Sequence, residues 1–185
     1  MIVKHTVQLG NSVIRTKAKA VTLPLQKETK QIIRNLIDSM RAGELVGMAA
    51  PQIGKSFRIF VTEIRPTKLR KKIGIKSDML RVFINPKVIA VSKKEVSDWE
   101  GCGSVADKHL FGKVRRPDSI TVRAINEFGE PFELKAQGLL ARVIQHEIDH
   151  LNGVVFTDKG DTKTYMSQNE YLQMKQREAA GYGKR

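Results

Sequence analysis

The spacing of hydrophobic residues predicts three helices along the chain. Residues 28–41 carry apolar side chains at intervals of three and four, and Gly43 follows as a helix stop. Residues 139–152 show the same periodicity, and Gly153 suits a left-handed stop after them. A last helix is expected over residues 161–180, before a glycine-rich end.

A shorter period predicts strands elsewhere in the chain. Residues 119–125 and 132–136 alternate between apolar and polar positions and are separated by a polar turn with one glycine, so they are expected to form a hairpin. Residues 57–62 and 82–91 are apolar enough for strands, the second interrupted at Pro86. This mixture of helices and strands predicts an α+β fold.

Composition fits one domain. The chain has 185 residues, 41% of them hydrophobic, which is enough for a single core. No internal repeat or low-complexity linker divides it, so we expect one catalytic domain over residues 1–185 with a basic tail from about residue 161. No apolar run approaches the length of about 18 residues needed to span a membrane. A single cysteine suits a reducing compartment such as the cytoplasm, while the basic N-terminus leaves an organelle transit peptide as the alternative.

Residues 145–150 contain the pattern His-Glu-x-x-His within an expected helix. At about 100° per residue, His146 and His150 point about 40° apart, so both imidazoles can bind one metal ion. Glu147 lies about 100° round from His146, where it can reach a water molecule at the metal without binding the metal itself. The pattern indicates a metal-dependent hydrolase.

A third metal ligand is needed, because a catalytic site normally has three protein ligands and one open position. Cys102, the only cysteine, is one candidate. Glu170 is the other, since a downstream glutamate completes the site of thermolysin-like peptidases. The spacing of the residues leaves both candidates open.

The chain is strongly basic, with a net charge of +14. Such a charge indicates an acidic partner, most commonly nucleic acid, or a solvated surface that keeps the protein soluble. The positive charge is concentrated in two places: residues 65–76, expected to be an exposed loop, and a tail bearing Lys175, Arg177, Lys184 and Arg185.

Three segments together resemble the three motifs of the peptide deformylase family. They are GMAAPQ at residues 47–52, EGCGS at residues 100–104 and QHEIDH at residues 145–150, in the order and approximate spacing of that family. The resemblance covers roughly residues 5–160. One motif alone is moderately specific, whereas the three together are highly specific.

The resemblance implies an α+β fold in which antiparallel and mixed strands pack around a central metal-binding HExxH helix. It implies that Cys102, His146 and His150 bind one divalent ion per chain, either Fe²⁺ or, in its place, Zn²⁺ or another divalent ion. A thiolate ligand makes such a site soft enough for these ions. Glu147 would act as general base and acid, and Glu170 would be a surface residue.

The resemblance also implies the substrate and its contacts. Family members remove the formyl group from N-formylmethionyl peptides leaving the ribosome. Gln52 and the backbone N–H of Gly103 would form the oxyanion pocket, while Val46 and Gly47 would pair with the substrate backbone. The basic surface would then dock on the ribosome. The tail is the better candidate, because the family's C-terminal helix is the expected docking element and can be removed without touching the metal site.

Two residues depart from the family pattern. Leu45 stands where the pattern has a glycine, and it would strain a backbone that needs a positive φ. Gly103 stands where bacterial members carry leucine, so an apolar wall beside the substrate is expected to be lost while the backbone donor remains.

Arg142 lies one helical turn before His146, and we expect it to pair with Glu100 beside Cys102.

Two other functions stay open: a deformylase-like protein that has lost turnover and binds the ribosome or RNA, and a metallopeptidase that uses Glu170. Retention of every catalytic side chain argues against lost turnover.

Overall fold

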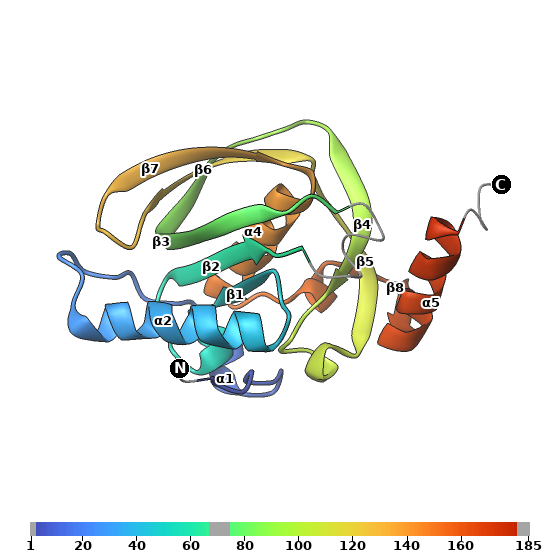
Figure 1. The fold of residues 1–185 in the computed structure, drawn as a ribbon, viewed down its shortest axis with the longest axis horizontal. Helices are drawn as coiled ribbons and strands as arrows, with labels where there is room; N and C mark the ends of the chain where they lie inside the picture. The colour runs from blue at the N-terminus through green and yellow to red at the C-terminus, as the bar shows by residue number, and fades with distance from the viewer. Residues whose placement is uncertain (1–2, 67–74, 181–185) are drawn as a thin grey trace.

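The computed structural model describes residues 3–66 and 75–180 and shows an α+β fold with two antiparallel sheets (Figure 1). The larger sheet has the strand order β1 (Gly47–Ala49), β2 (Ile59–Ile64), β3 (Asp78–Val91), β6 (Ser119–Ile125) and β7 (Pro131–Gln137). The smaller sheet has the order β4 (Glu95–Gly101), β5 (Leu110–Pro117) and β8 (Gly160–Ser167).

Helices connect and cover these sheets. They are α1 (Ser12–Arg15), α2 (Lys27–Ala42), α4 (Gly138–Leu151) and α5 (Gln168–Ala179), with short 3₁₀ helices η1 (Ala50–Ile53), η2 (Ala106–Lys108) and η3 (Phe156–Asp158). In Figure 1, α4 lies behind the larger sheet and α5 lies beyond the smaller sheet. Strands of both sheets contact α4, which places this helix between them.

The first expected long helix is confirmed as α2. Its apolar face packs on β1 and β2 in one buried cluster, which includes Ile32, Leu36 and Met40. The helix ends at Gly43 as expected, but Gly43 keeps an ordinary φ of −78°. The positive φ of 54° falls instead on Glu44.

The expected hairpin is confirmed, since β6 and β7 pair in one continuous register. Strand β2 begins two residues later than expected, because Phe57 makes a separate parallel bridge with Lys19. Strand β3 begins earlier and continues through Pro86 instead of stopping there. A register shift between Ile84 and Lys87, with a φ of 51° at Asn85, accommodates the proline.

The smaller sheet was not predicted as strands. Strand β4 is mostly polar and exposed, so it lacks the apolar alternation that signals a strand. In β5, the alternating buried positions are Gly112, Val114 and Arg116, and only one of them is a large apolar residue. The expected helix over residues 161–180 is wrong in its first part, where β8 pairs with β5, and correct from Gln168 onward.

The helix α4 matches its prediction to within one residue at each end. Its apolar face, formed by Leu140, Ile144, Ile148 and Leu151, packs into the cluster built around Phe60 and Phe83. Gly153 has the expected positive φ of +74°, and a Cβ there would lie 2.4 Å from the Arg15 carbonyl oxygen. The glycine is therefore required for both its conformation and its close contact.

Some sequence expectations fall on residues that the structure does not describe. Most of the basic loop at residues 65–76 lies outside the described residues, as do Lys184 and Arg185. Within the parts of the chain that are described, no helix is both long and apolar enough to cross a membrane.

Candidate metal centre and active site

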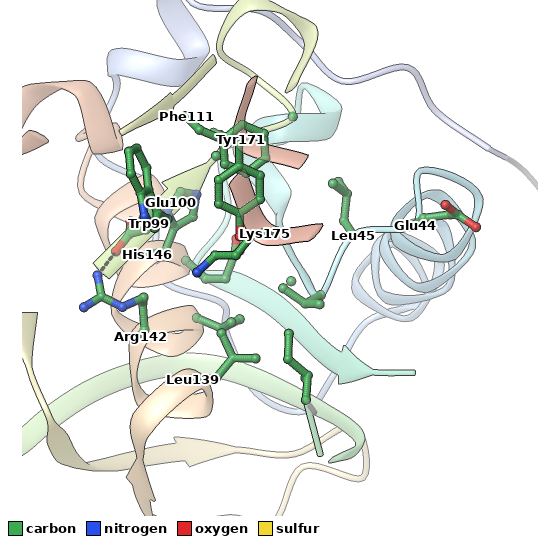
Figure 2. A pocket seen from close by; sticks show the side chains of 18 of the residues that line it. Glu44, Leu45, Trp99, Glu100, Phe111, Leu139, Arg142, His146, Tyr171 and Lys175 are labelled. Atoms are coloured by element: carbon green, nitrogen blue, oxygen red, sulfur yellow. Dashed lines mark hydrogen bonds and ion pairs between the residues drawn. The ribbon is translucent and has the colours of Figure 1, made fainter. Parts of the chain in front are cut away.

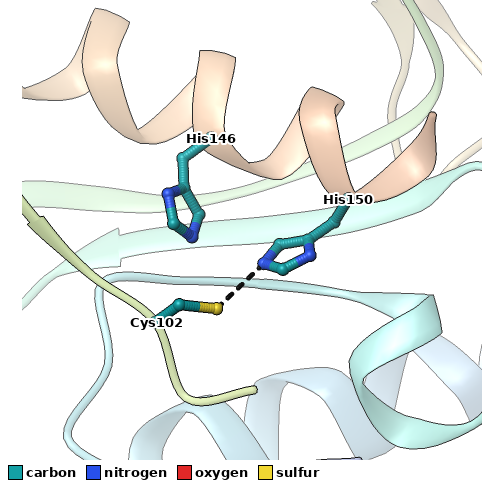
Figure 3. A group of neighbouring side chains, drawn as sticks. All are labelled: Cys102, His146 and His150. Atoms are coloured by element: carbon teal, nitrogen blue, oxygen red, sulfur yellow. Dashed lines mark hydrogen bonds between the residues drawn. The ribbon is translucent and has the colours of Figure 1, made fainter. Parts of the chain in front are cut away.

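Three side chains bring their metal-binding atoms together. His146 and His150 come from α4, and Cys102 follows the end of β4 (Figure 3). Their ligand atoms all lie within 4.8 Å of one another, and Cys102 Sγ is 3.1 Å from His150 Nε2. A sulfur and two imidazole nitrogens at this separation suit a single transition-metal ion.

The surroundings of Cys102 favour its ionised form. Ser104 donates its backbone N–H to the sulfur at 3.4 Å, and Gln52 Nε2 approaches it at 3.7 Å. Burial opposes ionisation of the thiol, but the neighbouring His150 and His146 outweigh it and lower the pKa of Cys102 to about 5. The thiolate is the form that binds a metal, so this environment prepares Cys102 for that role.

Glu100 orients the first histidine. Its Oε2 atom accepts a hydrogen bond from His146 Nδ1 at 2.9 Å, which leaves Nε2 to face the metal position. Burial alone would raise the pKa of Glu100, but hydrogen bonds from Arg116 and His146 hold it well below its ordinary value. Arg142 Nη1 donates to Glu100 Oε1 at 2.7 Å, so the expected pairing of these two residues is confirmed.

Arg116 is a buried residue whose role the sequence analysis missed. It forms a two-point ion pair with Glu100, at 2.6 and 2.9 Å, and donates to Asp149 Oδ2 at 2.8 Å. Asp149 lies on α4 directly before His150, and Lys159 Nζ donates to its Oδ1 atom at 2.7 Å. Arg116 thus ties β4 to α4, and nothing in its local sequence signals this contact.

Glu147 lies in the same buried region as the histidines. Burial raises the pKa of its carboxyl group to about 7, against the lowering effect of His146 and His150. Within the described part of the chain, its Oε2 atom has no hydrogen-bond partner. The carboxylate is therefore available to a reacting molecule.

Position 47 in β1 has to be a glycine, because Glu147 packs against it. A Cβ at Gly47 would lie 2.4 Å from Glu147 Oε1 and 2.8 Å from Val143 Cγ1, so any side chain here would displace the glutamate. This is a second requirement for glycine, beyond the substrate pairing expected from the sequence.

The edge of the larger sheet is open beside this glycine. Among the described residues, β1 is the last strand of the sheet and pairs only with β2. The Val46 carbonyl accepts a hydrogen bond from Glu63 N at 3.0 Å, and so faces β2. The alternation of an antiparallel ladder then turns the N–H and C=O groups of Gly47 toward the open edge.

The amide of Gln52 is fixed in one orientation. Its Oε1 atom accepts a hydrogen bond from Ala49 N at 2.8 Å, and η1 holds the residue in a buried position. Its Nε2 group therefore faces Cys102 and the metal position. Gly103 lies beside them, and its carbonyl is held by Gln8 Nε2 at 2.8 Å.

Glu170 does not belong to this site. It is an exposed residue of α5, and the group of ligand atoms found among the described residues contains Cys102 and the two histidines instead. The geometry required by the peptidase hypothesis is absent.

These residues open into one cavity of about 280 Å³. Every catalytic, substrate-binding and metal-binding residue expected from the sequence lines it except His150, which is fully buried behind His146. Figure 2 shows further side chains around the cavity that the sequence did not indicate; they are Trp99, Phe111, Leu139, Tyr171 and Lys175. The last two belong to α5, so removing the tail would remove one wall of this cavity.

Comparison with known proteins identifies the family. The family model described as polypeptide deformylase matches residues 3–165. The peptide deformylase of Halothermothrix orenii is 40% identical over 152 residues, covering 82% of this chain and 90% of that protein.

Solved structures agree in fold. A peptide deformylase structure from Legionella pneumophila has a TM-score of 0.75 at 31% identity, covering 98% of this chain and 95% of that chain. A Met-Ala-Ser-bound class I type b peptide deformylase from Acinetobacter baumannii has a TM-score of 0.77 at 28% identity, covering 85% of this chain and 98% of that chain. With the family model, the relatives and the arrangement of the site in agreement, this chain belongs to the peptide deformylase family, the metal-dependent hydrolases that remove the formyl group from the N-terminus of peptides.

Proposed function

We propose that deformylation takes place in the cavity between β1, α4 and the segment after β4, with N-formylmethionyl peptides as substrates. The observation that carries this assignment is the convergence of a Cys-His-His ligand group with a buried, unpartnered glutamate in one opening. The Met-Ala-Ser peptide bound to the Acinetobacter baumannii relative supports the choice of substrate.

The metal ligands would be Cys102, His146 and His150. The donor set fits a divalent ion of intermediate softness, for which we propose Fe²⁺, with Zn²⁺ as the alternative. When bound, such an ion acidifies a water molecule toward neutral pH and polarises the formyl oxygen. The helix α4 would then be a metal-binding HExxH helix, with Glu100 holding His146 in the correct orientation.

Glu147 would move the protons of the reaction. It accepts a proton as water attacks the formyl carbon, and a C–O bond forms. It then passes that proton to the nitrogen as the C–N bond breaks, giving formate and a free N-terminus. A carboxyl group whose pKa is raised toward neutrality by burial suits both steps.

Gln52 and Gly103 would stabilise the oxyanion. Gln52 can donate from Nε2 because its Oε1 is already held by Ala49. The backbone N–H of Gly103 is the second donor. One such donor is commonly worth about 3 kcal/mol of transition-state stabilisation.

The open edge of β1 would hold the peptide backbone in strand fashion. Gly47 has the freer backbone groups for this pairing, since the Val46 carbonyl already accepts from β2. Val46 lines the cavity beside it and would contribute contacts to the same peptide segment.

We further propose that the protein is a single catalytic domain that works at the ribosome, in a reducing compartment such as the cytoplasm. The net charge of +14 supports attraction to ribosomal RNA. Arg177 is exposed on α5 and belongs to the basic tail. Lys175 faces the cavity instead, which removes it from the docking surface.

The assignment is tested by formate release from formyl-Met-Ala-Ser. Protein purified without oxygen and loaded with Fe²⁺ should release formate, and the Glu147→Gln variant should not. Formate release that is no greater from the wild type than from Glu147→Gln, with either Fe²⁺ or Zn²⁺, would contradict the proposal.

A further inference from the structure

The helix α5 closes one side of the catalytic cavity. Tyr171, Leu172 and Lys175 line the same opening as His146 and Glu147. The match to the family model ends at residue 165, before this helix begins. This wall of the cavity is thus contributed by a segment outside the family match.

The position of α5 depends on β8 and on an aromatic contact. The helix follows β8 directly, and β8 pairs with β5 so that Met166 lies opposite Phe111. The ring of Tyr171 stacks on that of Phe111, with 4.2 Å between the centroids and 6° between the planes. The Trp99 ring also contacts Tyr171, in a tilted arrangement with 5.9 Å between the centroids. No residue of α5 is fully buried, so these rings are its main attachment to the site.

Lys175 lies one helical turn after Tyr171, on the same face of α5. Its Nζ atom is 5.9 Å from the centroid of the Tyr171 ring, and Figure 2 shows the side chain extending below that ring, with its nitrogen on the side of Trp99 and His146. Lys175 Nζ lies 2.9 Å from Oε2 of Glu178, whose side chain is half-exposed. An ion pair of this kind is weak and exchanges readily with another carboxylate.

Three of the other charged groups in the cavity contact one another, while Glu44 and Glu147 are further acidic groups that line it. Arg142 and His146 both contact Glu100, and Glu147 is assigned to the reaction. Lys175 therefore presents positive charge to the outer part of the cavity, where residues after the formylmethionine would leave the site.

Resting on the proposed function, we propose that α5 forms a wall of the substrate cleft and that Lys175 selects peptides with a carboxylate side chain at the second or third position. The aromatic rings hold the wall in place, and Lys175 supplies an attraction that neutral peptides do not gain. The helix then helps to determine which peptides are deformylated fastest.

The test compares peptides of equal length at constant ionic strength. The substrates are formyl-Met-Ala-Ser, formyl-Met-Glu-Ser and formyl-Met-Ala-Glu, with formyl-Met amide as a substrate too short to reach α5. The variant Lys175→Met should raise KM for one or both acidic peptides by about three- to ten-fold and leave kcat unchanged. It should not change KM for formyl-Met-Ala-Ser or formyl-Met amide.

The matched control is Lys163→Met, which removes the same charge from an exposed position on β8 outside the cavity. It should change none of the four KM values. Equal KM changes for acidic and neutral peptides, equal changes in the two variants, or no change would overturn the role of Lys175. Turnover of formyl-Met amide by the wild type separates these results from a failure of the proposed function, because that substrate tests the metal site alone.

Discussion

The side chain of Leu45 fills the space beside Gly103. Its Cδ1 atom lies 3.3 Å from the position that a Cβ on residue 103 would take, and Thr6 Cγ2 lies 3.2 Å from the same position. The two departures from the family pattern therefore lie side by side, and Leu45 occupies part of the space that a side chain at residue 103 would take. The expected loss of an apolar wall is wrong, because Leu45 supplies it. Leu45 also avoids the backbone strain of a positive φ, because the positive φ falls on Glu44.

The pairing of Leu45 with Gly103 predicts a specific double-mutant result. Gly103→Leu alone should lower the unfolding free energy by about 1–3 kcal/mol, because the new side chain overpacks against Leu45 and Thr6. Adding Leu45→Gly should recover part of that loss, with a coupling energy of about 0.5–3 kcal/mol. Urea unfolding of the wild type, the two single variants and the double variant measures this. Strictly additive effects would show that the two positions are independent.

The third metal ligand is tested by metal content. Cys102→Ser should lose most of its metal after desalting, because a hydroxyl group is a much poorer ligand than a thiolate. Glu170→Gln should keep a full equivalent, since Glu170 is exposed on α5. Loss of metal from the Glu170 variant with retention in the Cys102 variant would restore the peptidase hypothesis.

If Glu147 transfers protons, its substitution should abolish turnover without affecting metal binding. Glu147→Gln should retain metal and fold but release formate several orders of magnitude more slowly, because an amide cannot accept the proton of the attacking water. Metal analysis and a formate assay on the same sample decide the matter. Near-normal turnover in a fully loaded variant would remove Glu147 from the mechanism.

The buried ionic cluster predicts a large cost for Glu100→Gln. This change leaves Arg116 and Arg142 without their carboxylate, and breaking a buried pair commonly costs about 3–5 kcal/mol of unfolding free energy. Metal affinity should also fall by about 10- to 100-fold, because His146 loses its orienting partner. Urea unfolding and competition with a chelator measure the two effects.

A surface pair supplies the control for Glu100. Glu133 accepts two hydrogen bonds from Arg123, and the two side chains are 50% and 61% exposed. Glu133→Gln should therefore lower the unfolding free energy by less than about 1 kcal/mol. Equal losses of unfolding free energy in both variants would mean that the buried cluster stabilises the fold no more than a surface ion pair does.

The ribosome proposal predicts salt-dependent binding carried by the tail. Neutralising Arg177, Lys184 and Arg185 with glutamine should reduce co-sedimentation with ribosomes more than neutralising the basic residues at 65–76. If six phosphates of single-stranded RNA are contacted, the log–log slope of affinity against salt should be about −4. The test substitutes charged residues and does not truncate the tail, because removing α5 would open the catalytic cavity. Equal pelleting of all variants at every salt concentration would leave the charge as a solubility feature.

The sequence by itself determined the local elements with a strong hydrophobic period and the reacting groups placed on them. Helix α2, the β6–β7 hairpin and α4 could be predicted because a period of 3.6 or 2 is a property of neighbouring residues. His146, Glu147 and His150 could be placed on one side of a helix for the same reason. Spacing could not choose between Cys102 and Glu170, and only the family motif favoured the cysteine.

The tertiary structure decided what depends on contacts between distant segments. Arg116 can be buried in β5 because Glu100 and Asp149, from two other elements, compensate its charge. Strand β4 forms, despite its polar sequence, through pairing with β5. Leu45 could replace a side chain at position 103 only because two separate loops meet at the cavity. The same holds for α5, because its Tyr171 packs on Phe111 and Trp99 of the smaller sheet. Burial and pairing at these positions are set by partners far away in the chain, and a local period carries no information about them.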